Sequence, residues 1–85
     1  MKIIYSSKFI KEYKKLPEEI KITAEFKEKI FRNNPFNKIL NTHKLSGKLK
    51  EFWSFSINNK YRIIFELEKN NLIYFHSVGD HSIYQ

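Results

Sequence analysis

The stretch Trp53-Ser54-Phe55-Ser56-Ile57-Asn58-Asn59-Lys60-Tyr61-Arg62-Ile63-Ile64-Phe65 decides the fold of this chain. Its first five residues alternate large apolar side chains with serines, which is the period-2 pattern of a half-buried β-strand. Residues 58–60 hold two asparagines, and asparagine tolerates the left-handed backbone of a tight turn. Residues 61–67 again place a bulky side chain at every second position. The stretch therefore predicts a β-hairpin with one apolar face.

Arg62 stands within the return strand of this hairpin, on the face opposite the bulky residues. A guanidinium among apolar neighbours is costly unless an anionic group meets it. One interpretation is a structural salt bridge with Glu51 or Glu66. The other is that an anionic ligand approaches Arg62, and the pattern by itself leaves both open.

Two helices are expected before the hairpin. Residues 2–5 form a short strand, and Ser6 and Ser7 are good N-caps for a first helix. Pro17 ends that helix and suits the first turn of a second one, which residues 33–35 close. The first helix carries its apolar side chains at helical spacing, at Phe9, Ile10, Tyr13 and Leu16.

Residues 36–46 are predicted as a loop and residues 71–78 as a final strand. The order β-α-α-β-β-β predicts an α+β fold, in which an antiparallel four-stranded sheet carries an N-terminal helix hairpin on one face. The neighbour of the first strand is left open. The helices are expected to cover the bulky face of the hairpin. The other face is expected to be a shallow polar floor, formed by Ser54, Ser56, Arg62 and Ile64.

Composition narrows the class of protein. The chain has 85 residues, which predicts one domain over residues 1–85, and its 41% hydrophobic and 16% aromatic content can supply a core. It has no cysteine, which excludes disulfides, thiolate metal sites and a catalytic thiol. Its three histidines fit no metal-ligand spacing, so we expect no metal. No apolar run approaches the 18 residues that a membrane span needs.

The net charge of +7 predicts a polyanionic partner. Lysines gather on and beside the hairpin, and a solvated lysine stays charged at neutral pH. We therefore expect them to bind an RNA backbone rather than to transfer protons. These lysines are Lys44, Lys48, Lys50 and Lys60.

An ordered set of short motifs runs through the chain. It consists of His43-Lys44-Leu45-Ser46-Gly47, residues 52–57, Tyr61-Arg62-Ile63-Ile64-Phe65 and Val78-Gly79-Asp80-His81-Ser82-Ile83-Tyr84. This set resembles the RelE/ParE superfamily of bacterial toxin–antitoxin toxins over essentially the whole chain. The resemblance implies a cytoplasmic, ribosome-dependent endoribonuclease that cleaves mRNA. It also implies neutralisation by a cognate antitoxin and no cofactor.

The resemblance implies roles for four residues. Arg62 matches the strand arginine that contacts the scissile phosphate, and His81 matches an arginine or histidine near the leaving group. Tyr84 matches a terminal aromatic that stacks on the substrate or hydrogen-bonds to it. His43 lies in the loop where several relatives place an acid–base glutamate or histidine.

The chain also departs from the pattern of RelE itself, which carries lysines where this chain has Ser54 and Ser56. The departure favours histidine chemistry, as in the YafQ-like and YoeB-like members. RNA supplies its own nucleophile, the 2′-hydroxyl, so His43 would act as general base and His81 as general acid. Histidine suits both tasks because its free pKa of about 6.5 leaves both protonation states populated. The products would be a 2′,3′-cyclic phosphate and a 5′-hydroxyl.

Two other functions compete with this one. The ParE branch poisons DNA gyrase without catalysis, and a small basic RNA-binding module would need neither activity. Two histidines and a tyrosine beside an arginine favour the endoribonuclease, because a gyrase inhibitor has no need of titratable groups. The third histidine, His76, lies inside a strand and is expected to be structural.

Overall fold

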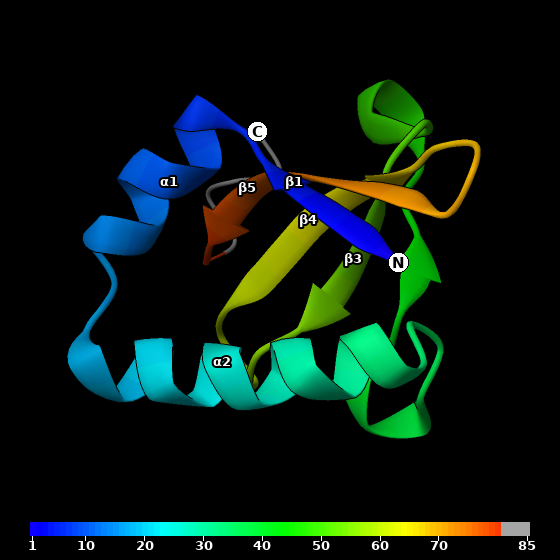
Figure 1. Ribbon diagram of the computed structural model, residues 1–85. Coiled ribbons are helices and arrows are strands. Elements are labelled where there is room, and N and C mark those ends of the chain that lie inside the picture. The colour runs from blue at the N-terminus through cyan, green and yellow to red at the C-terminus, as the bar shows by residue number, and fades with distance from the viewer. Residues whose placement is uncertain (81–85) are drawn as a thin grey trace.

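Residues 1–80 are described by the structure, a computed structural model, and they form two layers (Figure 1). The elements are β1 (Lys2–Tyr5), α1 (Ser7–Lys14), α2 (Glu18–Asn33), the 3₁₀-helix η1 (Lys38–Leu40), β2 (His43–Lys44), the 3₁₀-helix η2 (Gly47–Leu49), β3 (Trp53–Ser56), β4 (Arg62–Leu67) and β5 (Leu72–Gly79). The predicted hairpin is thus β3 and β4.

The sheet of residues 1–80 has five strands in the order β1-β5-β4-β3-β2. β1 runs parallel to β5, and the other neighbours are antiparallel. The prediction of an antiparallel four-stranded sheet is therefore wrong in both strand number and orientation. β2 lies inside the predicted loop, because a strand of two residues is too short to show alternation. A four-residue β1 likewise carries no signal for the direction of its neighbour.

Both helices cover the same face of the sheet, as predicted. Phe9 of α1 and Phe31 of α2 reach one aromatic cluster, with ring centroids 5.5 Å each from Phe75 on β5. Phe31 also stacks on Phe55 of β3 at 4.7 Å and meets Phe65 of β4 edge-on at 4.9 Å. Such aromatic packing supplies much of the apolar burial that a short chain needs.

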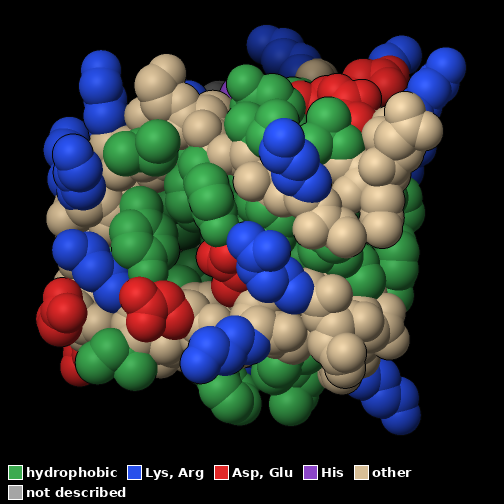
Figure 2. All heavy atoms as spheres, viewed as in Figure 1, with side chains coloured by type: hydrophobic (Ala, Val, Ile, Leu, Met, Phe, Trp, Pro, Cys, Tyr) green, Lys and Arg blue, Asp and Glu red, His purple; other side chains and the backbone are tan. Residues whose placement is uncertain are grey.

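A groove separates the two helices at the surface (Figure 2). Its volume is about 680 Å³, and Tyr5, Phe9, Ile10 and Tyr13 form its apolar lining. Two large apolar side chains of α2 stay outside the core: Ile22 is 63% exposed and Phe26 is 58% exposed.

The hairpin turn does not use a left-handed asparagine. Within residues 1–80, the non-glycine residues with positive φ are Asn41, Asn70 and Asn71. Asn58 instead closes the turn with its side chain, whose Oδ1 accepts hydrogen bonds from the backbone N–H groups of Lys60 and Tyr61 at 2.9 and 2.8 Å. An asparagine side chain can imitate a backbone turn in this way.

Candidate functional site

The sheet face turned away from the helices carries a row of four side chains. His43 pairs with Ser54, Ser54 pairs with Ile64, and Ile64 pairs with Ser77. Directly opposed residues of antiparallel strands project on the same face. Ser54, Ile64 and Ser77 are at most 1% exposed, so the middle of this face is buried. The prediction of a shallow polar floor fails at Ser54 and Ile64, because alternation reports the face of a side chain but not what covers it.

Arg62 lies on this same face, as predicted, in a second row with Ser56 and Gly79. Its neighbour Ile63 belongs to the core under the helices, so the alternation of β4 turns Arg62 the other way. β2 and β4 are two strand spacings apart, or roughly 10 Å. The sheet therefore places His43 and Arg62 on one face, on two strands that β3 separates.

The Arg62 guanidinium is held by neutral acceptors. Its Nη1 donates to the Oγ of Ser56 at 2.5 Å and to the backbone oxygen of Asn58 at 2.8 Å. Within residues 1–80, no carboxylate lies within ion-pairing distance of Arg62. A salt bridge with Glu51 or Glu66 is therefore not formed, and no carboxylate of residues 1–80 neutralises Arg62.

His43 is exposed at the sheet edge on β2. Its Nδ1 lies 3.0 Å from the backbone oxygen of Asn41, which has a left-handed φ of 51°. A carbonyl oxygen can only accept, so this contact assigns the proton of the neutral ring to Nδ1. Nε2 then carries a lone pair and can accept a proton.

The four lysines do not gather at one place. Lys44 has its Nζ 5.9 Å from the ring of Trp53, which packs against the core, so Lys44 lies on the helix side of the sheet. Lys60 is exposed at the hairpin turn near Arg62, with its Nζ 5.6 Å from the Tyr61 ring. Lys48 and Lys50 are exposed in and after η2, at the other end of β3.

Sequence reasoning missed three residues near Arg62 and His43. Ser56 anchors Arg62, which only the pairing of β3 with β4 reveals. Phe52 packs on His76 with ring centroids 4.7 Å apart, which agrees with a structural role for His76. Phe52 directly precedes β3 and is two residues from Ser54, so the alternation of the strand could have placed both on one face. The third residue, Ser77, has a buried Oγ with no hydrogen-bond partner in residues 1–80, and no sequence signal marks it.

His81 and Tyr84 lie outside the described residues. The described chain reaches Asp80, directly after Gly79, which pairs with Arg62. Across residues 1–80, no three His, Asp or Glu side chains are grouped so that they could bind a metal ion. No helix of that part is long and apolar enough to cross a membrane.

The groove between the helices holds the clearest pKa shifts of the described chain. Burial, helped by a hydrogen bond to Glu28, raises the pKa of Tyr5, and burial beside Glu25 raises that of Tyr13. A hydrogen bond to Tyr5 raises the pKa of Arg32. Tyr5, Glu28 and Arg32 pair with one another, and the Tyr13 hydroxyl donates to the backbone oxygen of Lys21, so all four side chains bond on the helix side.

Comparisons with known proteins point to one family. A family model described as the bacterial toxin of a type II toxin–antitoxin system, YafQ, matches residues 1–84. A search of curated protein sequences gave no match.

Solved structures share the fold. YafQ from E. coli strain BL21(DE3) has a TM-score of 0.80 at 21% identity, covering 96% of this chain and 94% of that one. A YoeB/ParE toxin from Agrobacterium tumefaciens has a TM-score of 0.80 at 14% identity, covering 95% and 99%. The E. coli DinJ–YafQ toxin–antitoxin complex matches with a TM-score of 0.76 at 21% identity, covering 95% and 92%.

Proposed function

Because this chain belongs to the YafQ family of bacterial toxins of type II toxin–antitoxin systems, which are ribosome-dependent mRNA interferases, we propose that His43 and Arg62 form the RNA-cleaving site. The observation that carries the proposal is the Arg62 guanidinium. It is anchored by neutral acceptors, is not balanced by a carboxylate of residues 1–80, and shares a face with His43.

The first step is deprotonation of the ribose 2′-hydroxyl. His43 Nε2 takes this proton, since the contact of Nδ1 with the Asn41 carbonyl keeps the ring in the required tautomer. The 2′-oxygen attacks the adjacent phosphorus. This attack needs only positioning and charge stabilisation from the protein, because the nucleophile belongs to the RNA.

Arg62 stabilises the charge that develops on the phosphate. Both described hydrogen bonds of its guanidinium use Nη1, so Nε and Nη2 can donate to the non-bridging oxygens. A donor that is held in place before the reaction pays little reorganisation when charge appears. Ser56 and the Asn58 carbonyl are the groups that hold it.

His81 protonates the departing 5′-oxygen, and Tyr84 orients the base or sugar. The P–O5′ bond breaks as the P–O2′ bond forms, which leaves a 2′,3′-cyclic phosphate and a 5′-hydroxyl. Lys60 binds the backbone beside Arg62, and Lys48 and Lys50 bind it at the other end of β3. Lys44 lies on the opposite side of the sheet and contributes only to the net positive field.

The partner that neutralises the toxin is a cognate antitoxin, as in the E. coli DinJ–YafQ complex. An acidic segment of that antitoxin would meet the positive charge of this chain. mRNA and the ribosome are the other partners, and a cytoplasmic location follows from both.

The test is cleavage of mRNA on purified, programmed ribosomes, with the ends of the fragments mapped chemically. We expect 5′-hydroxyl and 2′,3′-cyclic phosphate ends, and the same rate after the toxin has been treated with EDTA and returned to ribosomes in magnesium. Fragments with 5′-phosphate ends would rule out the 2′-hydroxyl as nucleophile. DNA damage on induction, with intact mRNA, would indicate a gyrase poison instead.

A further inference from the structure

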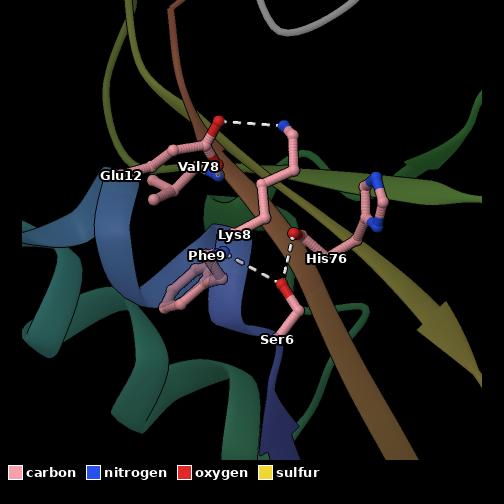
Figure 3. Close-up of polar contacts among 6 residues, drawn as sticks. All are labelled: Ser6, Lys8, Phe9, Glu12, His76 and Val78. Carbon is pink, nitrogen blue, oxygen red and sulfur yellow. Dashed lines mark hydrogen bonds and ion pairs between the residues drawn. The ribbon is translucent and has the colours of Figure 1, made fainter.

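The two halves of β5 are held in different ways. Its first half pairs with β1 on one side, up to the pair Tyr5 and Phe75. β1 ends there, so no strand of residues 1–80 pairs with the outer edge of residues 76–79. An open edge presents unsatisfied backbone groups. In this protein, side chains of the N-cap and of the second half of α1 bind such groups (Figure 3).

Ser6 and Glu12 make these contacts. The Ser6 hydroxyl donates to the backbone oxygen of His76 at 2.7 Å, and its oxygen also accepts from the Phe9 N–H at 2.9 Å as the N-cap of α1. The Glu12 Oε1 accepts from the Val78 N–H at 3.0 Å. The second carboxylate oxygen of Glu12 pairs with Lys8 at 2.9 Å.

The backbone that they hold contains a β-bulge. Ile64 pairs with Ser77, but Phe65 pairs with Phe75, so His76 is the extra residue on β5. The bulge shifts the alternation of the strand by one. Phe75 and Val78 are both in the core, although three residues separate them. Without the bulge, Val78 would point away from the core and Gly79 would change face.

The alternation of side chains along β5 decides on which face of the sheet its last residue lies. With the bulge, Gly79 lies in the same row as Arg62, and Asp80 is the next residue of the chain. The residues after Asp80 in the sequence include His81 and Tyr84. The bulge therefore sets the face on which β5 ends, just before His81, the general acid of the proposed function.

We propose that Ser6 and Glu12 are positioning residues, which lock the bulge of β5 and thereby fix Gly79 beside Arg62. The effect on catalysis rests on the proposed function. The contacts of Ser6 and Glu12 with β5, which form the lock, are independent of it. Neither residue touches the substrate. A misplacement of about 1 Å at a reacting group can cost roughly 100-fold in rate, so a loosened lock should lower turnover rather than binding.

Glu12 can be tested with three matched variants. Glu12→Ala removes the acceptor for Val78. Glu12→Gln keeps an acceptor oxygen but loses the charge, and Lys8→Ala loses the ion pair but keeps the Glu12 carboxylate. We expect Glu12→Ala to lower kcat for ribosome-dependent cleavage about 10- to 100-fold, with KM within about twofold. Glu12→Gln and Lys8→Ala should stay within about threefold of the wild type.

Ser6 offers a second, independent set. Ser6→Thr keeps both the donor and the N-cap, whereas Ser6→Asp keeps the cap but cannot donate to the His76 carbonyl. Ser6→Asp should lower kcat and Ser6→Thr should not. A purely structural role would instead lower activity only in proportion to the folded fraction, which circular dichroism measures.

Amide hydrogen exchange separates a failure of the lock from a failure of the proposed function. Glu12→Ala should speed exchange at the Val78 amide about 10-fold or more and shift the amide signals of Gly79 and Asp80, while the Phe55 amide stays protected. Unchanged signals at Val78, Gly79 and Asp80 overturn the lock, even if the wild type cuts no RNA. Altered signals with wild-type kcat overturn its role in cleavage.

Discussion

Two arginines show how the two sides of this molecule differ. Arg32, on the helix side, lies 3.2 Å from the Glu28 carboxylate and 3.2 Å from the Tyr5 hydroxyl, so its charge is compensated where it stands. Arg62, on the opposite face, is fastened to a serine hydroxyl and a backbone carbonyl, which orient a guanidinium without neutralising it. The first arrangement ties β1 to α2, and the second holds a cation that no carboxylate of residues 1–80 neutralises.

The same division holds for the rest of the two sides. The helix side contains the packed phenylalanines of the core and the groove in which the pKa values of Tyr5 and Tyr13 are raised. On the opposite face, His43 begins a row that continues through the buried Ser54, Ile64 and Ser77, and Arg62 lies in the neighbouring row. We propose that the helix side supplies stability and that the opposite face supplies chemistry, and the following substitutions test this division.

The largest effect on stability is expected at Phe31. It is fully buried and contacts phenylalanines on three strands. Phe31→Ala should lower the free energy of unfolding by about 3–5 kcal/mol, measured by urea denaturation. Phe26→Ala, on the same helix but 58% exposed, should change it by less than about 0.5 kcal/mol. Similar losses from both variants would contradict the assigned core.

Arg62 is expected to have the largest effect on activity. Arg62→Ala should reduce the cleavage rate by roughly 10²–10³, as loss of an oxyanion donor does elsewhere. Arg62→Lys should not restore it, because an ammonium lacks the planar fork. Arg32→Ala is the matched control, and cleavage on ribosomes should be unchanged because its partners lie on the helix side. An equal loss from both arginines would show that net charge alone is being measured.

His43 tests the acid–base part of the same face. His43→Ala should slow cleavage by roughly 10²–10⁴ and remove the limb of the pH–rate profile that reports the base. Stability should barely change, because the side chain is exposed at the edge of the sheet. A double variant with His81→Ala that retains full activity would exclude the mechanism.

The smallest effect is expected at Tyr5, on the helix side. Burial raises its pKa above the usual value of 10.0. The folded protein therefore holds this proton more tightly than the unfolded chain. The resulting stabilisation is complete below pH 10 and is lost as the pH rises through the higher pKa of the folded state.

Tyr5→Phe should make the loss of stability above pH 10 less steep, as measured by thermal unfolding across an alkaline pH series. Tyr74→Phe is the control, because Tyr74 is equally exposed at 37%. If the two variants lose stability in parallel as the pH rises, the raised pKa of Tyr5 does not contribute to the alkaline loss of stability.

Much of the site could be predicted from short-range pattern. The alternation of β3 and β4 placed Arg62 opposite the core, and the structure confirms it. The sequence placed His43 only in the loop before the hairpin, and its pairing with Ser54 puts it on the same face as Arg62. The anchoring of Arg62 by Ser56 and the bulge at His76 were not foreseen, because each depends on the register between strands.

The sequence by itself determined the local elements and their apolar faces, because alternation, helical spacing, Ser6 and Pro17 act through neighbouring residues. Only the tertiary structure decided that β1 runs parallel to β5, that β2 exists, and that Ser54 and Ile64 are buried on the second face. These features arise from contacts between residues far apart in the chain. A pattern that reports only which face a side chain takes cannot say which strand lies beside it or what covers it.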